Sequence, residues 1–354
     1  MGLNAQKVFM PTVANLETID LSNYKVVHKG WFAFSGMQTG RDECIRIAIH
    51  ESDEPILISP AYTTFRLDSS KKVLSEYLFM YFYRSEMDRY GWFISDSSVR
   101  ANLDWPRFLE IQLPVPFNCN GEPDVQRQHE IVDTWLGFKR MKRQNEELTE
   151  PLFQLCRSYL ENLKKHYELV EIGSYIEPVD IRNDNGLFGA DDVVGLATSK
   201  EVIQTKANLE GVNLSTYKTF RPREIAYVAD TSRRGDKVSL AMNKTDKTFL
   251  ISSISVVFRS KDEEVLDSYF LYLWFCRPEF DRYARFHSIG SAREAFDYTE
   301  MEKVKIPLPD IDTQRAIVNI YHCAEECRRI AAEADALSQT ISPALMQHII
   351  HEHN

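Results

Sequence analysis

The sequence of 354 residues lacks most of the motifs that mark membrane proteins and nucleotide-dependent enzymes. It has no uncharged apolar run of about 18 residues, so we expect no membrane-spanning helix. The first residues, Met1 to Gln6, have neither the basic nor the apolar region of a signal peptide. A G-x-G-x-x-G loop, a Walker loop and the N/D-P-P-F/Y motif of amino-methyltransferases are also missing. We therefore predict no catalytic residue and no cofactor site.

Cysteine is scarce and follows no metal-binding pattern. The six cysteines are Cys44, Cys119, Cys156, Cys276, Cys323 and Cys327. None of them forms a C-x-x-C pair, and no pair of histidines in zinc spacing lies near Cys323 and Cys327. We predict reduced thiols in the core or on helix faces, no metal site, and a cytoplasmic location.

Basic residues are fewer than acidic ones. The chain has 42 Lys and Arg against 52 Asp and Glu, a net charge of −10. This balance argues against a nucleic-acid partner, because a phosphate-binding surface needs Lys and Arg. Many acidic residues lie in helical stretches such as Glu146-Glu147 and Glu325-Glu326, where a solvated helix face explains them. The net charge therefore does not exclude a local basic patch.

An internal repeat is the strongest feature of the sequence. When the chain is shifted by 193 positions, 36 of the 115 pairs from Gly2 to Pro116 are identical without a gap. Ala14-Asn15-Leu16-Glu17 falls on Ala207-Asn208-Leu209-Glu210, for example. The first copy then carries seven extra residues around Phe117–Asp124. Two modules of one fold follow from this repeat.

The two copies differ at their start. Residues 167–194 form a leader before the second copy, whereas the first copy starts at Met1, opposite Val194. We therefore expect the first module to lack its N-terminal leader. If the leader forms one or two strands, the first module has an open sheet edge.

Each module has an α+β pattern. Ile45–His50, Ile56–Phe65, Lys237–Met242 and Phe249–Phe258 are rich in β-branched and aromatic residues and read as strands. Ser75–Tyr90 and Ser268–Tyr283 follow with helical spacing, and a short strand ending in Pro-x-Pro closes each module. The predicted divisions are residues 1–124 and 166–312 for the modules, and 125–165 and 313–354 for two long helices.

The long helices carry apolar stripes that predict pairing. The stripe residues are Phe138, Met141, Leu148, Leu152 and Leu155 in the first helix, and Ile320, Ala324, Ala331, Ala334, Ile341 and Leu345 in the second. We expect Pro151 and Pro343 to break the helices. The economical arrangement is an antiparallel coiled coil of the two helices that separates the modules. The alternative is that each helix docks on its own module.

Polar loops and a basic patch are the candidate contacts with DNA. Arg suits bidentate contacts with guanine or phosphate, and Gln suits adenine. The candidates are Gln38, Arg41, Ser98, Arg100, Arg233, Arg234, Lys237, Arg285, His287, Ser291 and Arg293. The competing interpretations are solvated hairpin tips, structural ion pairs at Asp88-Arg89 and Asp281-Arg282, and helix capping or packing by Arg84 and Arg277. Apolar positions shared by the copies are expected in the core.

The repeated motifs resemble one known family. Ile306-Pro307-Leu308-Pro309 followed by Gln314-Arg315-Ala316-Ile317-Val318, and Leu113-Pro114-Val115-Pro116 followed by Gln128-His129-Glu130-Ile131-Val132, are similar to the specificity subunit of type I restriction-modification systems. Asn208-Leu209-x-x-Val212-x-Leu214-Ser215-x-Tyr217-Lys218 and Ser291-Ala292-Arg293 add to the resemblance, which spans essentially the whole chain.

The resemblance implies a non-catalytic subunit that binds double-stranded DNA. Each module would be a target recognition domain that reads one half of a bipartite, asymmetric target, and the helices would set the spacer. Two modification (methyltransferase) subunits and two restriction (translocase/nuclease) subunits would dock on it, and S-adenosylmethionine, ATP and Mg would bind to those partners. The alternatives are an assembly scaffold that does not read DNA, a truncated or shuffled specificity subunit, and a self-sufficient enzyme, which the missing methyltransferase motif opposes.

Overall fold

A computed structural model describes residues 1–12, 20–37, 42–96, 101–230, 237–290 and 294–352. The chain divides into two compact units, each with its own core. Unit 1 comprises Met1–Glu147 and Cys327–Asn354, and unit 2 comprises Leu148–Glu326. No described helix combines the length and the hydropathy needed to cross a membrane.

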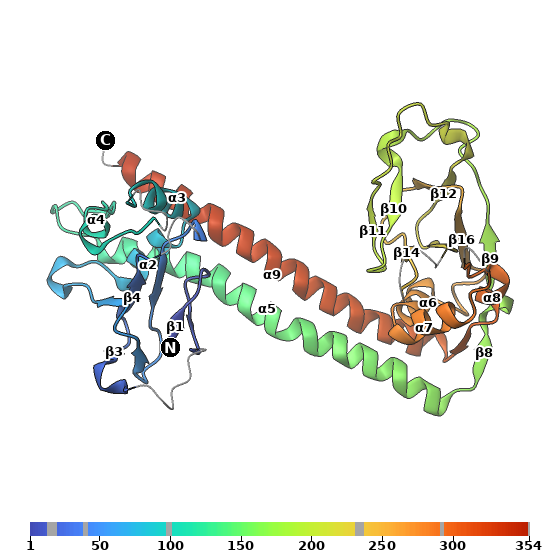
Figure 1. Ribbon diagram of the computed structural model, residues 1–354, viewed down its shortest axis with the longest axis horizontal. Helices are drawn as coiled ribbons and strands as arrows, with labels where there is room; N and C mark the ends of the chain where they lie inside the picture. The colour runs from blue at the N-terminus through green and yellow to red at the C-terminus, as the bar shows by residue number, and fades with distance from the viewer. Residues whose placement is uncertain (13–19, 38–41, 97–100, 231–236, 291–293, 353–354) are drawn as a thin grey trace. The chain divides into compact units, whose positions relative to one another are not determined.

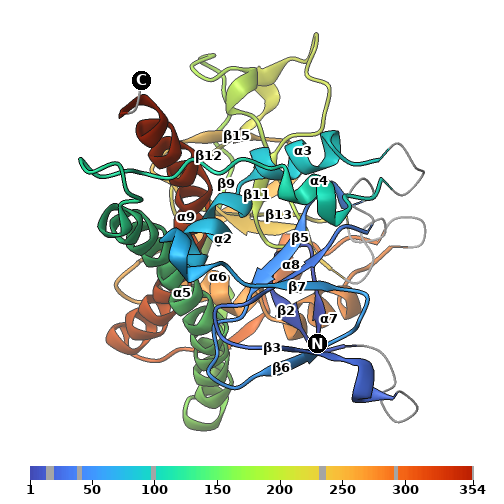
Figure 2. The ribbon, with the colours of Figure 1, turned by 90° about the vertical axis from the view of Figure 1, so that its left-hand side faces the viewer.

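Unit 1 consists of small antiparallel sheets and short helices (Figures 1 and 2). Its central sheet has the order β5-β4-β7, beside the pairs β1-β2 and β3-β6. The helix α2 packs with the first turns of α5 around buried Tyr77, Ile131 and Trp135. The elements of unit 1 are β1 Gly2–Leu3, β2 Phe9–Met10, β3 Lys25–Val27, β4 Phe32–Ser35, β5 Arg46–Ile49, β6 Ile56–Ile58, β7 Thr63–Phe65, α2 Ser75–Phe82, α3 Ser85–Phe93, α4 Trp105–Leu109 and the start of α5 Val125–His166.

Unit 2 contains the same elements and, among the described residues, three additional strands, β8, β9 and β17. Its main sheet has the order β14-β13-β16-β9, beside the pairs β10-β11, β12-β15 and β17-β8. The elements are β8 Leu169–Glu171, β9 Ile176–Val179, β10 Val194–Leu196, β11 Val202–Gln204, β12 Lys218–Phe220, β13 Ile225–Val228, β14 Leu240–Met242, β15 Phe249–Ile251, β16 Ser255–Ser260, α6 Ser268–Phe275, α7 Pro278–Phe286, α8 Tyr298–Glu302, β17 Lys305–Pro307 and the start of α9 Ile311–Glu352.

The repeat in the sequence is also a repeat of elements. The bounds of β3, β4, β6, α2, α3 and α4 fall on those of β12, β13, β15, α6, α7 and α8 at the same shift of 193 positions. The local signals agree as well: Asp20 and Asn213 each cap a short 3-10 helix by accepting the backbone N–H two residues ahead. The two copies of the repeat have therefore folded into equivalent elements.

The leader of unit 2 forms β8 and β9, the case that the sequence analysis treated only as a condition. Unit 1 has no counterpart of either strand among the described residues, so β7 is an edge strand where β16 is internal. The predicted strand ending in Pro-x-Pro exists in unit 2 as β17, but the prediction is wrong for unit 1, where the segment before Pro114 forms no strand. In unit 2, β17 pairs with β8 of the leader. The described residues of unit 1 include no counterpart of β8, so the equivalent segment has no strand to pair with.

Three further sequence predictions are corrected. Each predicted helical run is two short helices, because Arg84 and Arg277 adopt extended backbone conformations between them, the latter before Pro278. The two longest predicted strands, Ile56–Phe65 and Phe249–Phe258, are each two strands. Pro151 and Pro343 do not break α5 and α9, which continue through them for 42 residues each. Pro151 is exposed, so water can hydrate the carbonyl group that its missing N–H leaves free.

The described cysteines are free thiols, and Cys156 lies in the core of unit 2. Burial raises the pKa of the Cys156 thiol to about 11, so it stays protonated at neutral pH. A protonated thiol is a poor nucleophile and a poor metal ligand. Among the described residues, no group of three or more His, Cys, Asp or Glu side chains is placed to hold a metal ion.

Candidate nucleic-acid interface

Most of the predicted DNA contacts lie in four loops outside the described residues. These predicted residues are Gln38, Arg41, Ser98, Arg100, Arg233, Arg234, Ser291 and Arg293. The described members are Lys237, Arg285 and His287, all in unit 2. The structure describes the residues on both sides of each of these four segments.

In unit 2, the described residues that flank the two predicted loops pair with each other. Asp230, the last described residue before the loop 231–236, forms a β-bridge with Ala295. Ala295 is also paired with Ile289 across the loop 291–293, through backbone bonds of 3.0 and 3.1 Å. The N–H group of Phe296 donates to the carbonyl oxygen of Ala229 at 2.9 Å. The described residues that flank 231–236 and 291–293 are therefore hydrogen-bonded to each other, although they are about 60 positions apart in the chain.

Unit 1 joins its two loops in the same way. The N–H group of Leu103 donates to the carbonyl oxygen of Gly36 at 2.9 Å, and that of Asp96 donates to Asn102 at 3.0 Å. A Cβ atom at Gly36 would lie 1.7 Å from the Leu103 oxygen, so this crossing requires glycine. The described residues that flank 38–41 and 97–100 are therefore also hydrogen-bonded to each other.

In each unit an ion pair contacts the described residues that follow 38–41 or 231–236, and it is buried in unit 2 and partly exposed in unit 1. In unit 2 the Lys200 ammonium group contacts Asp281 and donates to the carbonyl oxygen of Val238 at 2.9 Å. Asp281 also accepts the N–H of Val238 at 3.0 Å, beside exposed Lys237. The same device recurs in unit 1, where Lys7 contacts Asp88 at 2.7 Å and Asp88 accepts the N–H of Ile45 at 2.8 Å. Asp88 and Asp281 are therefore members of structural ion pairs, as one of the competing interpretations of the sequence stated.

Arg285 and His287 have acidic partners inside unit 2. Arg285 forms an ion pair with Glu294. The His287 Nδ1 atom lies 3.6 Å from a Glu300 oxygen, and its ring lies tilted against that of Tyr283, with the ring centres 4.2 Å apart. Contact with phosphate would require these side chains to exchange carboxylate partners for DNA, which reduces the net gain. They are weaker candidates than the sequence suggested.

Arg277 has a structural role. Its side chain is buried, lies 2.6 Å from Glu161 and covers the Trp274 ring at 4.1 Å. These contacts hold the start of α7 against α5, both within unit 2. The packing alternative that the sequence left open is therefore the one observed for this residue.

Each unit has an exposed aromatic residue within the basic patch that the sequence indicated as a candidate contact with DNA. Phe286 ends α7 and Phe93 ends α3, at equivalent positions, and each is 84% exposed. We expected shared apolar positions to lie in the core, and this expectation is wrong here. A large apolar side chain kept exposed at the same position of both modules marks a contact surface better than a core position. Its identity in both copies was the available signal.

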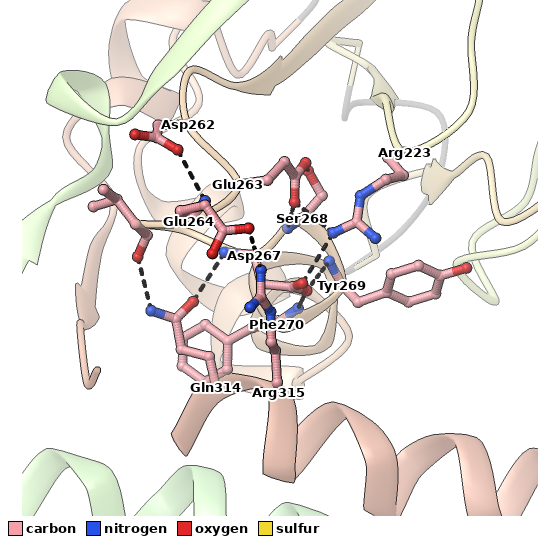
Figure 3. A network of polar contacts seen from close by, with 11 residues as sticks. Arg223, Asp262, Glu263, Glu264, Asp267, Ser268, Tyr269, Phe270, Gln314 and Arg315 are labelled. Carbon is pink, nitrogen blue, oxygen red and sulfur yellow. Dashed lines mark hydrogen bonds and ion pairs between the residues drawn. The ribbon is translucent and has the colours of Figure 1, made fainter. Parts of the chain in front are cut away.

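A glutamine at the start of each long helix fixes that helix to its module, and Figure 3 shows the one in unit 2, Gln314. Gln314 of α9 is fully buried; its amide oxygen accepts the N–H of Asp267, and its amide nitrogen donates to the carbonyl oxygens of Val265 and Pro309, all at 2.9 Å. Asp267 in turn caps α6 and pairs with Arg223 at 2.9 Å. Gln314 therefore fixes where α9 leaves the module.

Unit 1 repeats this connection with fewer bonds. Gln128 of α5 accepts the N–H of Leu74 at 2.9 Å and donates to the carbonyl oxygen of Lys72 at 3.0 Å. Both glutamines belong to the Pro-x-Pro…Gln motifs of the sequence. The motif is thus a joint between a module and a long helix.

The helices α5 and α9 contact each other within both units. In unit 1, Lys142 pairs with Asp335 at 2.9 Å. In unit 2, the rings of Phe153 and Tyr321 lie 5.5 Å apart, and the Cys156 thiol lies 3.8 Å from the Ile317 carbonyl oxygen.

The buried stripe of α5 lies one residue beyond the predicted one. Met141, Leu148 and Leu155 are exposed, and Phe138 and Leu152 are half-buried. The buried stripe instead includes Val132, Trp135, Cys156, Leu160 and Leu163. On α9, the predicted Ala324, Ala331 and Ala334 are buried, and Ile320, Ile341 and Leu345 are half-buried.

Polar residues in the middle of α5 explain the shift. The Lys139 ammonium group lies over the rings of Tyr83 and Trp135 at 4.5 and 4.6 Å, and burial lowers its pKa. Lys142 forms an ion pair with Asp335. A prediction that uses only apolar residues omits Lys139 and Lys142 and therefore selects the neighbouring face of α5.

Comparisons with known proteins agree with the resemblance in the motifs. Residues 213–332 match the family model described as "Type I restriction modification DNA specificity domain", which confirms that resemblance. No curated protein matches the chain. Among solved structures, the chain is similar in fold to a type I restriction-modification system S subunit from M. genitalium, at 12% identity and a TM-score of 0.54, over 91% of this chain and 83% of that one.

Two further solved structures are less similar. One is an HsdS subunit from Thermoanaerobacter tengcongensis, at 15% identity and a TM-score of 0.41, covering 98% of this chain and 88% of that one. The other comes from a study of complex assembly and conformational transition of the type I R-M system, at 14% identity and a TM-score of 0.39, covering 92% and 84%.

Proposed function

We propose that this chain is the DNA-specificity subunit of a type I restriction-modification complex and carries no catalytic site of its own. The match of residues 213–332 to the specificity-domain model carries this proposal. Each unit would be a target recognition domain that reads one half of a bipartite target in double-stranded DNA. Because the loops 38–41 and 231–236 differ in sequence, the target is asymmetric.

The long helices would form an antiparallel coiled coil that sets the unread spacer. The support is that α5 before residue 148 contacts α9 beyond residue 326, while α5 beyond residue 147 contacts the start of α9. Exposed Leu148, Leu155 and Tyr159 leave an apolar stripe on α5 for partners. Two modification and two restriction subunits would dock in the cytoplasm and supply S-adenosylmethionine, ATP and Mg.

Methylome sequencing of a host carrying this gene and its partners tests the proposal most directly. A bipartite, asymmetric methylated sequence that disappears on deletion of this gene is the expected result. A palindromic target would reject the loops as readers.

The scaffold alternative predicts a different salt response. In a gel shift with the partner methyltransferase, DNA reading by this chain must weaken steeply as salt rises, because phosphate contacts release counterions. A scaffold would leave the DNA affinity of the methyltransferase unchanged when this chain is added.

Replacing Arg233 and Arg234 with alanine should weaken binding to one half-site only. Each lost base contact is worth about 1–3 kcal/mol. Fluorescence anisotropy with duplexes altered in either half-site measures the effect, and Arg157→Ala, which removes an exposed charge on α5, is the matched control. Equal loss of affinity for all sequences, or no loss, would discard the assignment.

Phe286→Ala should reduce DNA affinity without lowering the stability of unit 2, because the ring is exposed in the free protein. Covering a phenylalanine ring against thymine methyl groups or sugars is worth about 1.5–3 kcal/mol. Phe93→Ala should have the same effect on the other half-site. Thermal unfolding and anisotropy together check the prediction, and a loss of stability without a loss of affinity would contradict it.

A further inference from the structure

The helices α3 and α7 present equivalent exposed faces, each made of three side chains. These side chains stand at the spacing i, i+3 and i+4, which places them on one side of a helix. They are Arg89, Trp92 and Phe93 in α3, and Arg282, Arg285 and Phe286 in α7. The first and third positions of this outward face are identical in the two units, and the second is different.

The opposite side of each helix is fixed in the same way in both units. A Cβ atom at Gly91 would lie 2.4 Å from a side-chain carbon of Ile45, so α3 packs closely against its unit. The Ser95 hydroxyl group donates to the carbonyl oxygen of Gly91 at 2.7 Å, and the Ser288 hydroxyl group donates to that of Ala284 at 2.7 Å. The last turn of each helix therefore holds its exposed side chains in equivalent positions, as a rigid recognition element does.

The variable position of the outward face carries different chemistry in the two units. Trp92 is 47% exposed and offers an apolar ring with a single N–H donor. The Arg285 side chain is 43% exposed and offers only N–H donors, in a planar fork. An apolar ring suits the methyl group of thymine, whereas the fork suits the O6 and N7 acceptors of guanine.

The acidic partner of Arg285 is consistent with a contact to a base edge. Glu294 contacts one terminal nitrogen of the guanidinium group, Nη1, and the other two nitrogens form no ion pair among the described residues. The carboxylate reduces the gain from phosphate but orients the fork and leaves two nitrogens that can donate to a base. The counterpart of Glu294 is Ala101, so the acidic residue is present with the arginine and absent with Trp92.

We propose that Trp92 and Arg285 are specificity-determining residues, each selecting a base in the half-site of its own unit. Trp92 selects thymine in one half-site and Arg285 selects guanine in the other. This inference rests on the proposed function, in which each unit reads half of a DNA target. DNA is the occupant because each face carries an arginine, and because α3 and α7 end shortly before the candidate loops 97–100 and 291–293.

The two shared positions serve both half-sites alike. Arg89 and Arg282 contact phosphate, which carries no sequence information. The ion pair of Arg282 with Glu279 at 3.2 Å is exposed and therefore opposes this contact only weakly. Phe93 and Phe286 provide the same apolar contact in each unit. Only the second position of the outward face can therefore distinguish the half-sites.

The experiment exchanges the variable residue in the full chain, in complex with the partner methyltransferase. Duplexes randomised in both half-sites are the probe, and the bound fraction is sequenced. Trp92→Arg should change the preference at one position from thymine to guanine by about tenfold or more, in the half-site of unit 1 only. Arg285→Trp should remove a guanine preference of similar size in the other half-site. The half-site of the unchanged unit is the matched control in each variant and shows that the complex has assembled.

Arg89→Ala separates backbone contacts from base selection. It should weaken binding to all duplexes alike and lower the salt dependence by about one counterion. If Trp92→Arg and Arg285→Trp also weaken all sequences alike, or leave every preference unchanged, the inference is overturned while the proposed function stands. A wild-type complex that prefers no sequence in either half-site would reject the proposed function, and this inference with it.

Discussion

Asp281→Ala is expected to destabilise unit 2 by about 3–5 kcal/mol, the range found when one partner of a buried ion pair is removed. Lys200 and Asp281 are both buried, and the carboxylate also accepts the N–H of Val238. Without it, the ammonium group keeps the Val238 carbonyl oxygen and the face of the Phe280 ring as partners and stays buried with an unbalanced charge. Urea unfolding followed by hydrogen exchange at the amides of β13 and β16 measures the loss in unit 2 alone.

Two variants separate charge imbalance from a simple loss of contacts. Lys200→Met combined with Asp281→Asn removes both charges while the asparagine oxygen can still accept the Val238 N–H, so stability should return to near the wild-type value. Asp88→Ala in unit 1 should cost less, because the Asp88 side chain is partly exposed. A double variant as unstable as Asp281→Ala would show that charge is not the cause.

Gln314→Leu should destabilise unit 2 by about 2–3 kcal/mol, since it leaves two buried backbone groups and one partly buried backbone group without their glutamine partner, at about 1 kcal/mol each. These groups are the N–H of Asp267 and the carbonyl oxygens of Val265 and Pro309. The side chain has nearly the same size, so the loss reports hydrogen bonding and not a cavity. The same unfolding measurement applies, with exchange read at the start of α6 and α9.

Gln128→Leu is the matched variant in unit 1. It leaves two backbone groups unpaired, at Leu74 and Lys72, so its effect should be about 1 kcal/mol smaller. Gln314→Glu keeps the acceptor for Asp267 but loses both donors, and it should lie between wild type and Gln314→Leu. A Gln314→Leu variant that unfolds like wild type would refute the role of this joint.

The internal repeat allowed much of the arrangement of elements in each unit to be predicted from the sequence. Identical residues at a shift of 193 placed six elements of one unit on those of the other, because the same local pattern of caps, turns and apolar positions folds the same way twice. Strands in the leader entered the sequence analysis only as a condition. The partners of these strands could not be predicted, since strand pairing between residues about 80 and 135 positions apart leaves no local signal.

The candidate interface was predicted only in outline. Polar composition pointed to the loops, but the pairing of the residues that flank them depends on the Asp230–Ala295 and Leu103–Gly36 contacts between distant segments. The acidic partners of Arg285 and His287, and the exposure of Phe93 and Phe286, likewise depend on which face each short helix turns outward. A rotation of about 100° per residue makes that face sensitive to a shift of one position.

The sequence by itself determined the two modules, the long helix after each of them, and the glutamine motif at each joint, since repetition and periodicity are properties of residue order. Only the tertiary structure decided which stripe of α5 is buried, which aspartates and arginines are structural, and which side chains α3 and α7 expose. Those features arise from contacts between residues far apart in the chain, where burial and pairing of charges outweigh the local apolar pattern.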